Sequence, residues 1–175
     1  MSTLDGYKAV MKDVQAGKFK PLYVLHGEEG FFIDRVSKEI EERALQEHER
    51  DFNLTILYGR DCDAEQVKDT CLRYPMMAER QVVILREAQS WRPDQWDKLE
   101  AYASKPTPTT VLVIGHKHKK LDGRKGFAKA AAKTGVVFHS EPLKDHVLPK
   151  WIQAYVTHHK RKIGQSEAML LAEHL

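Results

Sequence analysis

Cysteine is scarce in this chain of 175 residues, which has only Cys62 and Cys71. Two cysteines without CxxC spacing are too few for a disulfide framework, so we expect a cytoplasmic protein in a reducing compartment. The chain also lacks any run of about 18 apolar residues, which excludes a membrane-spanning helix. Its first residues have neither the basic nor the apolar segment of a secretion signal. These absences predict a protein that does not associate with a membrane.

The composition is that of a folded globular domain. Apolar residues make up 42% and charged residues 30% of the chain, which excludes disorder and collagen. The net charge of +3 is distributed unevenly. Residues 1–110 have 16 Lys and Arg against 20 Asp and Glu, a charge of −4, whereas residues 111–175 have 12 against 5, a charge of +7. This asymmetry is typical of a chain whose C-terminal part meets an anionic partner.

Short apolar segments alternate with amphipathic ones over the first 140 residues. The apolar segments predict strands at residues 22–25, 54–58, 81–85, 110–114 and 135–138. Helical spacing predicts helices between them, including one over residues 64–73 in which Val67 and Leu72 face inward. This alternation is typical of a five-stranded parallel sheet with helices on both faces. We therefore expect an α/β domain over residues 1–140.

Only helices are expected after this domain. Glu141 and Pro142 interrupt the alternation, and helical patterns follow at residues 147–159 and from Ser166 to Leu175. No stop signal ends the second pattern. We expect residues 141–175 to form the start of an all-helical domain in a truncated chain.

A strand, a glycine-rich turn and a helix over residues 22–40 occupy the place of a phosphate-binding P-loop. The functional motif is G-x-x-x-x-G-K-[ST], in which Lys binds the phosphates and the hydroxyl group binds magnesium. Counting from Gly27, the second Gly, the Lys and the Ser/Thr are replaced by Phe32, Ile33 and Asp34. Arg86 stands at the end of the third predicted strand, where a Walker B strand has an acidic residue.

These two departures predict a chain that neither hydrolyses ATP nor needs a cofactor. Gly27 and Gly30 are then interpreted as a tight turn, because Glu28, Glu29 and Asp34 place negative charge where phosphates would lie. A P-loop NTPase with an aberrant motif is the alternative function in the enzyme class.

Histidine pairs do not indicate a metal site. The pairs are His116 with His118, and His158 with His159. Neither pair has Cys, Asp or Glu at a spacing that would complete a zinc site. We expect no metal and interpret the histidines as surface residues.

Two segments of the chain match the sequence pattern of a known family. The first is PLYVLHGEE at residues 21–29, followed by Phe32 and Ile33. The second is YPMMAERQVV at residues 74–83. Together they resemble the delta subunit of bacterial DNA polymerase III, the clamp-opening subunit of the replicative clamp loader. The resemblance implies an AAA+-like α/β domain with a degenerate P-loop, then a helical lid, and a C-terminal collar that this chain would lack.

The resemblance also implies a clamp-binding loop. Two apolar residues of this loop insert into a hydrophobic pocket of the sliding clamp in the family, and they correspond to Met76 and Met77, preceded by Tyr74 and Pro75. The family often has Leu-Phe at the two positions. The loop is also unusually apolar for a surface connection, and methionine suits irregular protein grooves. The alternative is that both methionines cap the core beneath the loop.

A basic cluster follows the fourth predicted strand. Its members are Lys117, Lys119, Lys120, Arg124 and Lys125. Lysines of this kind could contact the phosphates of primed DNA, although solvated loops are the alternative. The resemblance implies that the partners are the sliding clamp, primed DNA and, through the collar, other clamp-loader subunits. An independent nucleic-acid-binding domain is the alternative function in the binding class.

Overall fold

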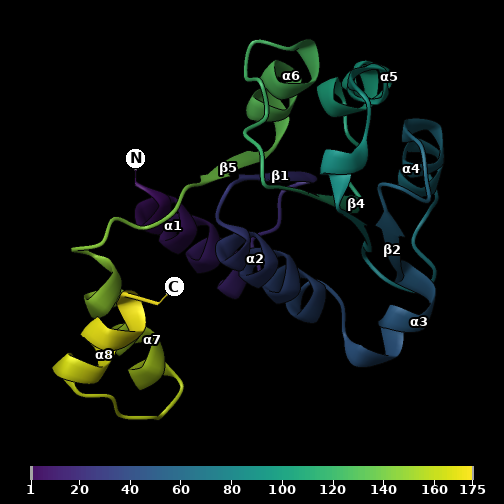
Figure 1. Cartoon of the computed structure of the whole chain (residues 1–175). Helices are drawn as coiled ribbons and strands as arrows, with labels where there is room; N and C mark the ends of the chain where they lie inside the picture. Colours follow the sequence, from purple (N-terminus) through teal and green to yellow (C-terminus); the bar gives the residue numbers. More distant parts are fainter. Residues whose placement is uncertain (1, 175) are drawn as a thin grey trace. The chain divides into compact units, whose positions relative to one another are not determined.

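The structure is a computed structural model that describes residues 2–174 (Figure 1). The chain divides into two compact units, Met1–Glu141 and Pro142–Leu175. The first unit contains the sheet and its covering helices, and the second contains two helices. Within residues 2–174, no helix combines the length and the apolar character needed to cross a bilayer.

The first unit is built on a five-stranded parallel sheet with the order β2-β3-β4-β1-β5. Its strands are β1 (Leu22–Gly27), β2 (Leu54–Tyr58), β3 (Gln81–Arg86), β4 (Thr110–Lys117) and β5 (Val136–Ser140). The predicted fold class, a parallel α/β sheet, is confirmed. All six residues of β1 are buried, whereas the edge strand β2 is mostly half-buried. This difference explains why the central strands have continuous apolar runs, since both of their faces are covered.

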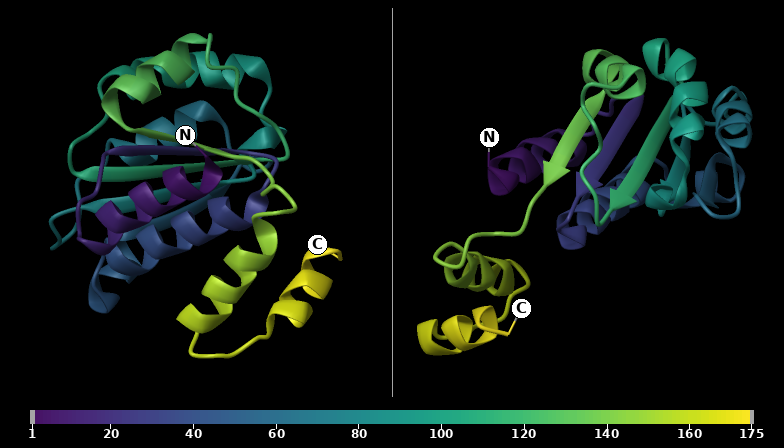
Figure 2. Two further views of the ribbon diagram at one scale, coloured as in Figure 1. Left: turned by 90° about the vertical axis from the view of Figure 1, so that its left-hand side faces the viewer. Right: turned by 45° about the horizontal axis from the view of Figure 1, so that its top comes forward.

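Helices cover both faces of the sheet (Figure 2). On one face lie α1 (Thr3–Gln15) and α2 (Gly30–Arg43), and on the other lie α4 (Ala64–Cys71), α5 (Pro93–Ser104) and α6 (Gly126–Thr134). Alternate residues of β1 point to opposite faces of the sheet. Leu22 and Val24 belong to the core between the sheet and helices α4, α5 and α6, whereas Tyr23 lies beside α1. Three short helices that the sequence does not predict complete the unit: η1 (Glu47–Glu49), α3 (Arg50–Asn53) and η2 (Ala88–Ser90).

Helix α4 ends earlier than its sequence pattern indicates. Asp63 caps its N-terminus by accepting a hydrogen bond from the backbone N–H of Gln66. Val67 and Cys71 are fully buried on its inner face. The inward orientation predicted for Leu72 is wrong, because its side chain is 55% exposed. Leu72 follows the last helical residue and is rotated by about 100° from Cys71, away from the sheet.

The second unit consists of two helices packed against each other, α7 (Leu148–His158) and α8 (Gln165–Ala172). Ile152 of α7 and Ala168 of α8 are buried. Helix α8 ends at Ala172 and so is shorter than predicted, and Leu175 lies outside the described residues. That this unit is the start of a lid domain stays a prediction.

Candidate functional site

The turn between β1 and α2 is closed by contacts within the chain. The backbone N–H of Glu29 donates to the carbonyl oxygen of Ser140 at 3.2 Å, and Ser140 Oγ donates to the carbonyl oxygen of Glu29 at 2.7 Å. Gly27 has φ 130°, and a Cβ atom at this position would overlap the backbone of Ser140. Only glycine therefore allows the end of β5 to approach the turn this closely.

A carboxylate already occupies the N-terminus of α2. Glu29 precedes Gly30, the first residue of the helix, and its Oε1 accepts a hydrogen bond of 2.9 Å from the backbone N–H of Phe31. The free N–H groups and the dipole of a helix N-terminus stabilise an anion, which in a P-loop is a phosphate. Here the anion is the side chain of Glu29.

The remaining P-loop positions have structural roles. Phe32 and Ile33, which stand where the motif requires Gly and Lys, are 2% and 1% exposed in the core between α2 and the sheet. Asp34, in the place of the Ser/Thr, forms an ion pair with Lys117 at the end of β4, with Nζ 2.7 Å from the carboxylate. The motif residues were therefore replaced by residues that stabilise the fold.

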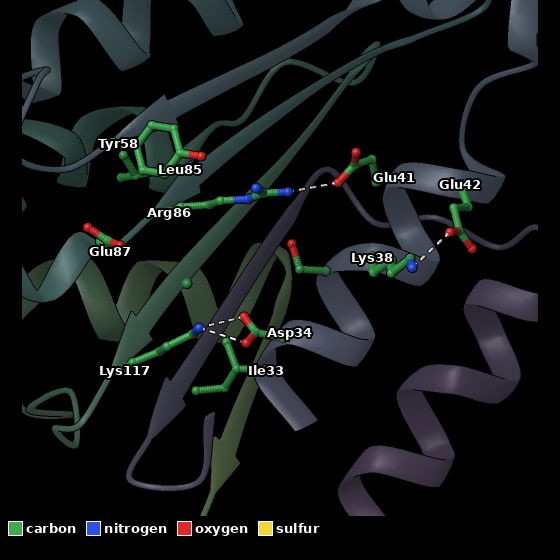
Figure 3. A pocket seen from close by; sticks show the side chains of 12 residues that line it. Ile33, Asp34, Lys38, Glu41, Glu42, Tyr58, Leu85, Arg86, Glu87 and Lys117 are labelled. Carbon is green, nitrogen blue, oxygen red and sulfur yellow. Dashed lines mark hydrogen bonds and ion pairs between the residues drawn. The ribbon is translucent and has the colours of Figure 1, made fainter. Parts of the chain in front are cut away.

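A cavity of about 510 Å³ lies between α2 and the carboxyl ends of β2, β3 and β4 (Figure 3). Parallel α/β sheets commonly bind ligands at this edge. Each cation that lines the cavity is paired with a carboxylate: Lys38 with Glu42 at 3.6 Å, Arg86 with Glu41 at 3.1 Å, and Lys117 with Asp34. Glu87 adds a fourth acidic side chain. Among its lining residues the cavity presents no unpaired cation to a polyphosphate.

The predicted clamp-binding loop is exposed. The loop connects α4 to β3, and the apolar side chains on and beside it are largely in solvent: Phe52 (70% exposed), Leu72 (55%), Tyr74 (89%), Met76 (59%) and Met77 (100%). We call these five residues the apolar surface. Pro75 lies between two of them and is half-buried. This exposure excludes the alternative in which Met76 and Met77 cap the core.

Asn53 fastens the middle of the loop. Its Nδ2 donates to the carbonyl oxygen of Met76 at 2.9 Å, and its Oδ1 accepts from the backbone N–H of Met76 at 2.6 Å. Asn53 is the last residue of α3 and is 3% exposed. The loop is thereby attached to the segment that leads into β2.

Two further contacts fasten the ends of the loop. Gln81, the first residue of β3, donates through Nε2 to the carbonyl oxygen of Arg73 at 2.7 Å, where the loop leaves α4. The guanidinium group of Arg80 lies 5.0 Å from the ring centroid of Phe19, in cation–π geometry. The loop is held at both ends and in the middle, while the Met77 side chain is 100% exposed.

Sequence reasoning missed three residues of this region. Leu72 was expected in the core, and neither Phe52 nor Asn53 was singled out. The sequence does contain one signal for Phe52, since an aromatic residue outside any predicted strand or helix is a candidate for a surface contact. Nothing local indicates the role of Asn53, because Met76 lies 23 residues further along the chain.

The structure does not make one cluster of the five predicted phosphate-contact residues. Lys117 is paired with Asp34 at the cavity. Arg124 forms two hydrogen bonds with the carboxylate of Asp122, at 3.0 and 3.1 Å, and these hold the pKa of Asp122 at about 2. Lys119, Lys120 and Lys125 are exposed and form no ion pair within residues 2–174.

The expectation that all four paired histidines lie at the surface is wrong for one of them. His116 is buried in β4, where Nδ1 lies 3.1 Å from the carbonyl oxygen of Lys119 and the ring packs against Trp96. Burial lowers its pKa. His118, His158 and His159 are exposed. Across residues 2–174, no group of three His, Cys, Asp or Glu side chains is arranged to hold a metal ion.

The sequence matches a family profile and a curated relative. The sequence profile of "DNA polymerase III, delta subunit" matches residues 23–141. DNA polymerase III subunit delta of Bacillus subtilis is 26% identical over 142 residues, which cover 77% of this chain and 41% of the relative. The chain therefore spans less than half of the length of that relative.

Solved structures share the fold. The DNA clamp loader delta protein of Bacillus subtilis matches with a TM-score of 0.77 and 24% identity, over 94% of this chain and 51% of that protein. A DNA polymerase III gamma subunit-related protein of Thermotoga maritima matches with a TM-score of 0.54 and 13% identity, over 94% of this chain and 57% of that one. A RuvB variant from the same organism also matches with a TM-score of 0.54 and 13% identity, over 94% of this chain and 52% of that protein.

The family match covers most of the first unit. It begins at Tyr23 in β1 and ends after β5, so it includes the closed β1–α2 turn, the cavity and the apolar loop. Residues 23–141 are more than half of the chain, and the fold of the clamp loader delta protein agrees with the sheet described above. The chain belongs to the DNA polymerase III delta subunit family.

Proposed function

We propose that this chain binds the DNA sliding clamp as a clamp-loader delta subunit and helps to open the ring during DNA replication. The observation that carries the proposal is the exposure of Met76 and Met77 on a loop that is fastened at both ends and in its middle. Large apolar side chains held in solvent on a fixed loop typically mark a protein interface. The name of the Bacillus subtilis structure, a DNA clamp loader delta protein, supports this choice of partner.

The proposed action is mechanical. Burying two methionine side chains contributes about 3–6 kcal/mol before the costs of association are subtracted. A ligand shifts a conformational equilibrium only by its difference in affinity for the two states. The delta chain would therefore favour an open ring by binding the open conformation of the clamp more tightly than the closed one.

We further propose that this chain does not hydrolyse ATP. The carboxylate of Glu29 at the N-terminus of α2 and the paired cations of the cavity support this proposal. Residues 141–175 would form the start of a helical lid. Contacts with other loader subunits would be made by the part of a delta subunit that follows this lid. A phosphate-release assay with MgATP tests the first point, and turnover above that of a protein-free blank would contradict it.

The clamp-binding proposal is tested with the double variant Met76→Ala, Met77→Ala. Its affinity for the cognate sliding clamp, measured by surface plasmon resonance, should fall by about 100-fold, which corresponds to about 3 kcal/mol of lost apolar burial. The matched control is Met169→Ala, Leu170→Ala on α8, where both side chains are more than half exposed. Clamp affinity that is equal in the wild type and the loop variant would contradict the proposal.

A contribution to DNA binding is the second candidate function. It rests on the exposed lysines Lys119, Lys120 and Lys125, which line one pocket and form no ion pair within the described residues. For each lysine that contacts a phosphate, replacement by Gln should make the slope of log K against log salt less negative by about 0.9. The measurement uses the assembled loader on primed DNA, and an unchanged slope in the triple variant would exclude these residues.

A further inference from the structure

Every polar atom of the Asn53 side chain forms a hydrogen bond, and two of the three bonds hold the apolar loop. Besides its two hydrogen bonds to the backbone of Met76, Nδ2 lies 2.9 Å from the carbonyl oxygen of Glu49, one turn earlier in the chain. Both N–H groups of the amide and its oxygen are therefore used. Its burial makes these bonds costly to lose, since an unpaired polar group in the interior is destabilising.

The conformation of the loop next to this contact is unusual. Met77, the residue after the one that Asn53 holds, has φ 52°, a left-handed conformation that residues with a Cβ atom rarely adopt. Its side chain is 100% exposed, so no packing of its own stabilises this backbone. A strained and exposed residue persists when its surroundings determine its conformation, and the adjacent contact with Asn53 supplies that constraint.

We propose that Asn53 is a positioning residue for clamp binding. It keeps the loop in the conformation that projects Met76 and Met77 into solvent before the clamp arrives. A loop that is ordered in advance loses less conformational entropy when it binds, so the constraint raises affinity without a contact between Asn53 and the clamp. This inference rests on the proposed clamp-binding function.

The chemistry of the contact requires an amide. Asp has the same shape but cannot donate to the carbonyl oxygens of Met76 and Glu49, and Ala can neither donate nor accept. Asn53→Asp and Asn53→Ala should therefore both release the middle of the loop. Asn53 is also the only asparagine in the chain, so selective labelling of asparagine with ¹⁵N gives a single pair of side-chain amide signals.

The first test examines the free wild-type chain. Hydrogen exchange of the Asn53 side-chain amide and of the Met76 backbone N–H should be at least tenfold slower than in an unstructured peptide, because both groups donate part-buried hydrogen bonds. In Asn53→Ala, which removes the acceptor of this bond, the Met76 N–H should exchange at least tenfold faster than in the wild type. Exchange at the unstructured rate in the wild type would overturn the inference without any variant.

The second test is a double-mutant cycle on binding to the cognate sliding clamp. Asn53→Ala should weaken binding about tenfold in the wild-type background but less than twofold in a Met77→Ala background, because its effect is transmitted through the loop. A purely structural role would weaken binding by the same factor in both backgrounds. The control is Gln153→Ala on α7, which should leave clamp affinity unchanged in both backgrounds.

The outcomes separate this inference from the proposed function. If the Met76→Ala, Met77→Ala variant binds the clamp as the wild type does, the proposed function is wrong. If that variant loses binding while Asn53→Asp and Asn53→Ala bind normally, only the positioning role of Asn53 is wrong.

Discussion

Lys117 and Asp34 are joined by an ion pair in which Nζ lies 2.7 Å from the carboxylate, between the end of β4 and the first turns of α2 (Figure 3). Asp34 stands where a P-loop has the hydroxyl group that binds magnesium. The contact joins residues 83 positions apart. The degenerate P-loop has thus become part of the packing between α2 and the sheet.

Restoring the lysine of the P-loop should damage the fold instead of restoring nucleotide binding. Ile33 is 1% exposed, so Ile33→Lys would place an unpaired cation in the core. We expect this variant to lose about 3–5 kcal/mol of the free energy of unfolding, as measured by urea denaturation, and to bind no ATP. The control Ser37→Lys, at a half-buried position on the same helix that lines the cavity, should keep wild-type stability. Tight ATP binding by a stable Ile33→Lys variant would disprove this interpretation.

Substitution of Met77 by glycine should separate stability from binding. Glycine adopts φ 52° without steric cost, which offsets its greater freedom in the unfolded chain, so Met77→Gly should be from 0 to about 1 kcal/mol more stable than the wild type. The same variant should bind the clamp less tightly, because an anchoring side chain is lost. Urea denaturation and surface plasmon resonance measure the two effects. A destabilised variant would argue against backbone strain at Met77.

Protonation of His26 should weaken the fold in acid. His26 is buried at the end of β1, where its ring stacks on His139 and Nδ1 accepts from the backbone N–H of Leu121 at 3.2 Å. Burial, followed by the nearby His139, His116 and Lys120, lowers its pKa from 6.5 to about 4. Between these values the unfolded chain binds more protons than the folded one, so stability falls as the pH falls.

The size of this effect can be isolated with a variant. On lowering the pH from 7 to 4.5, His26 should account for about 2 kcal/mol of the lost free energy of unfolding. His26→Asn keeps an acceptor for the N–H of Leu121 but does not titrate, so its stability should be less dependent on pH by that amount. The exposed control His118→Asn should retain the wild-type dependence. Equal pH profiles for wild type and His26→Asn would contradict the burial of a neutral imidazole.

Val67 and Leu72 should respond in opposite ways to truncation. Val67 is fully buried on the inner face of α4. Val67→Ala should therefore lower the free energy of unfolding by about 2 kcal/mol and leave clamp affinity nearly unchanged. Leu72 is exposed on the apolar surface, so Leu72→Ala should change stability by less than about 0.5 kcal/mol. If Leu72 joins the interface, the same variant will weaken clamp binding. A large loss of stability in Leu72→Ala would instead place this side chain in the core.

Local patterns were sufficient to predict the sheet. The segments that form β1, β3 and β4 have continuous apolar runs because these strands are covered on both faces. Such a run can be recognised in the sequence alone. The failure of the P-loop motif was also visible, since that motif lies in one short segment. The apolar character of Met76 and Met77 was equally local, and the resemblance to the delta family rested in part on the segment that contains them.

The arrangement of the candidate site depended on contacts between distant segments. Asn53 reaches Met76 across 23 residues, Lys117 reaches Asp34 across 83, and Ser140 closes the turn at Glu29 across 111. Leu72 has the apolar character of a core residue, yet the helix end one residue earlier directs it to solvent. The sequence by itself determined which segments are buried, because burial leaves a periodic pattern of apolar residues. Only the tertiary structure decided which polar side chains pair and which apolar side chains stay exposed, because such contacts depend on how segments far apart in the chain are brought together.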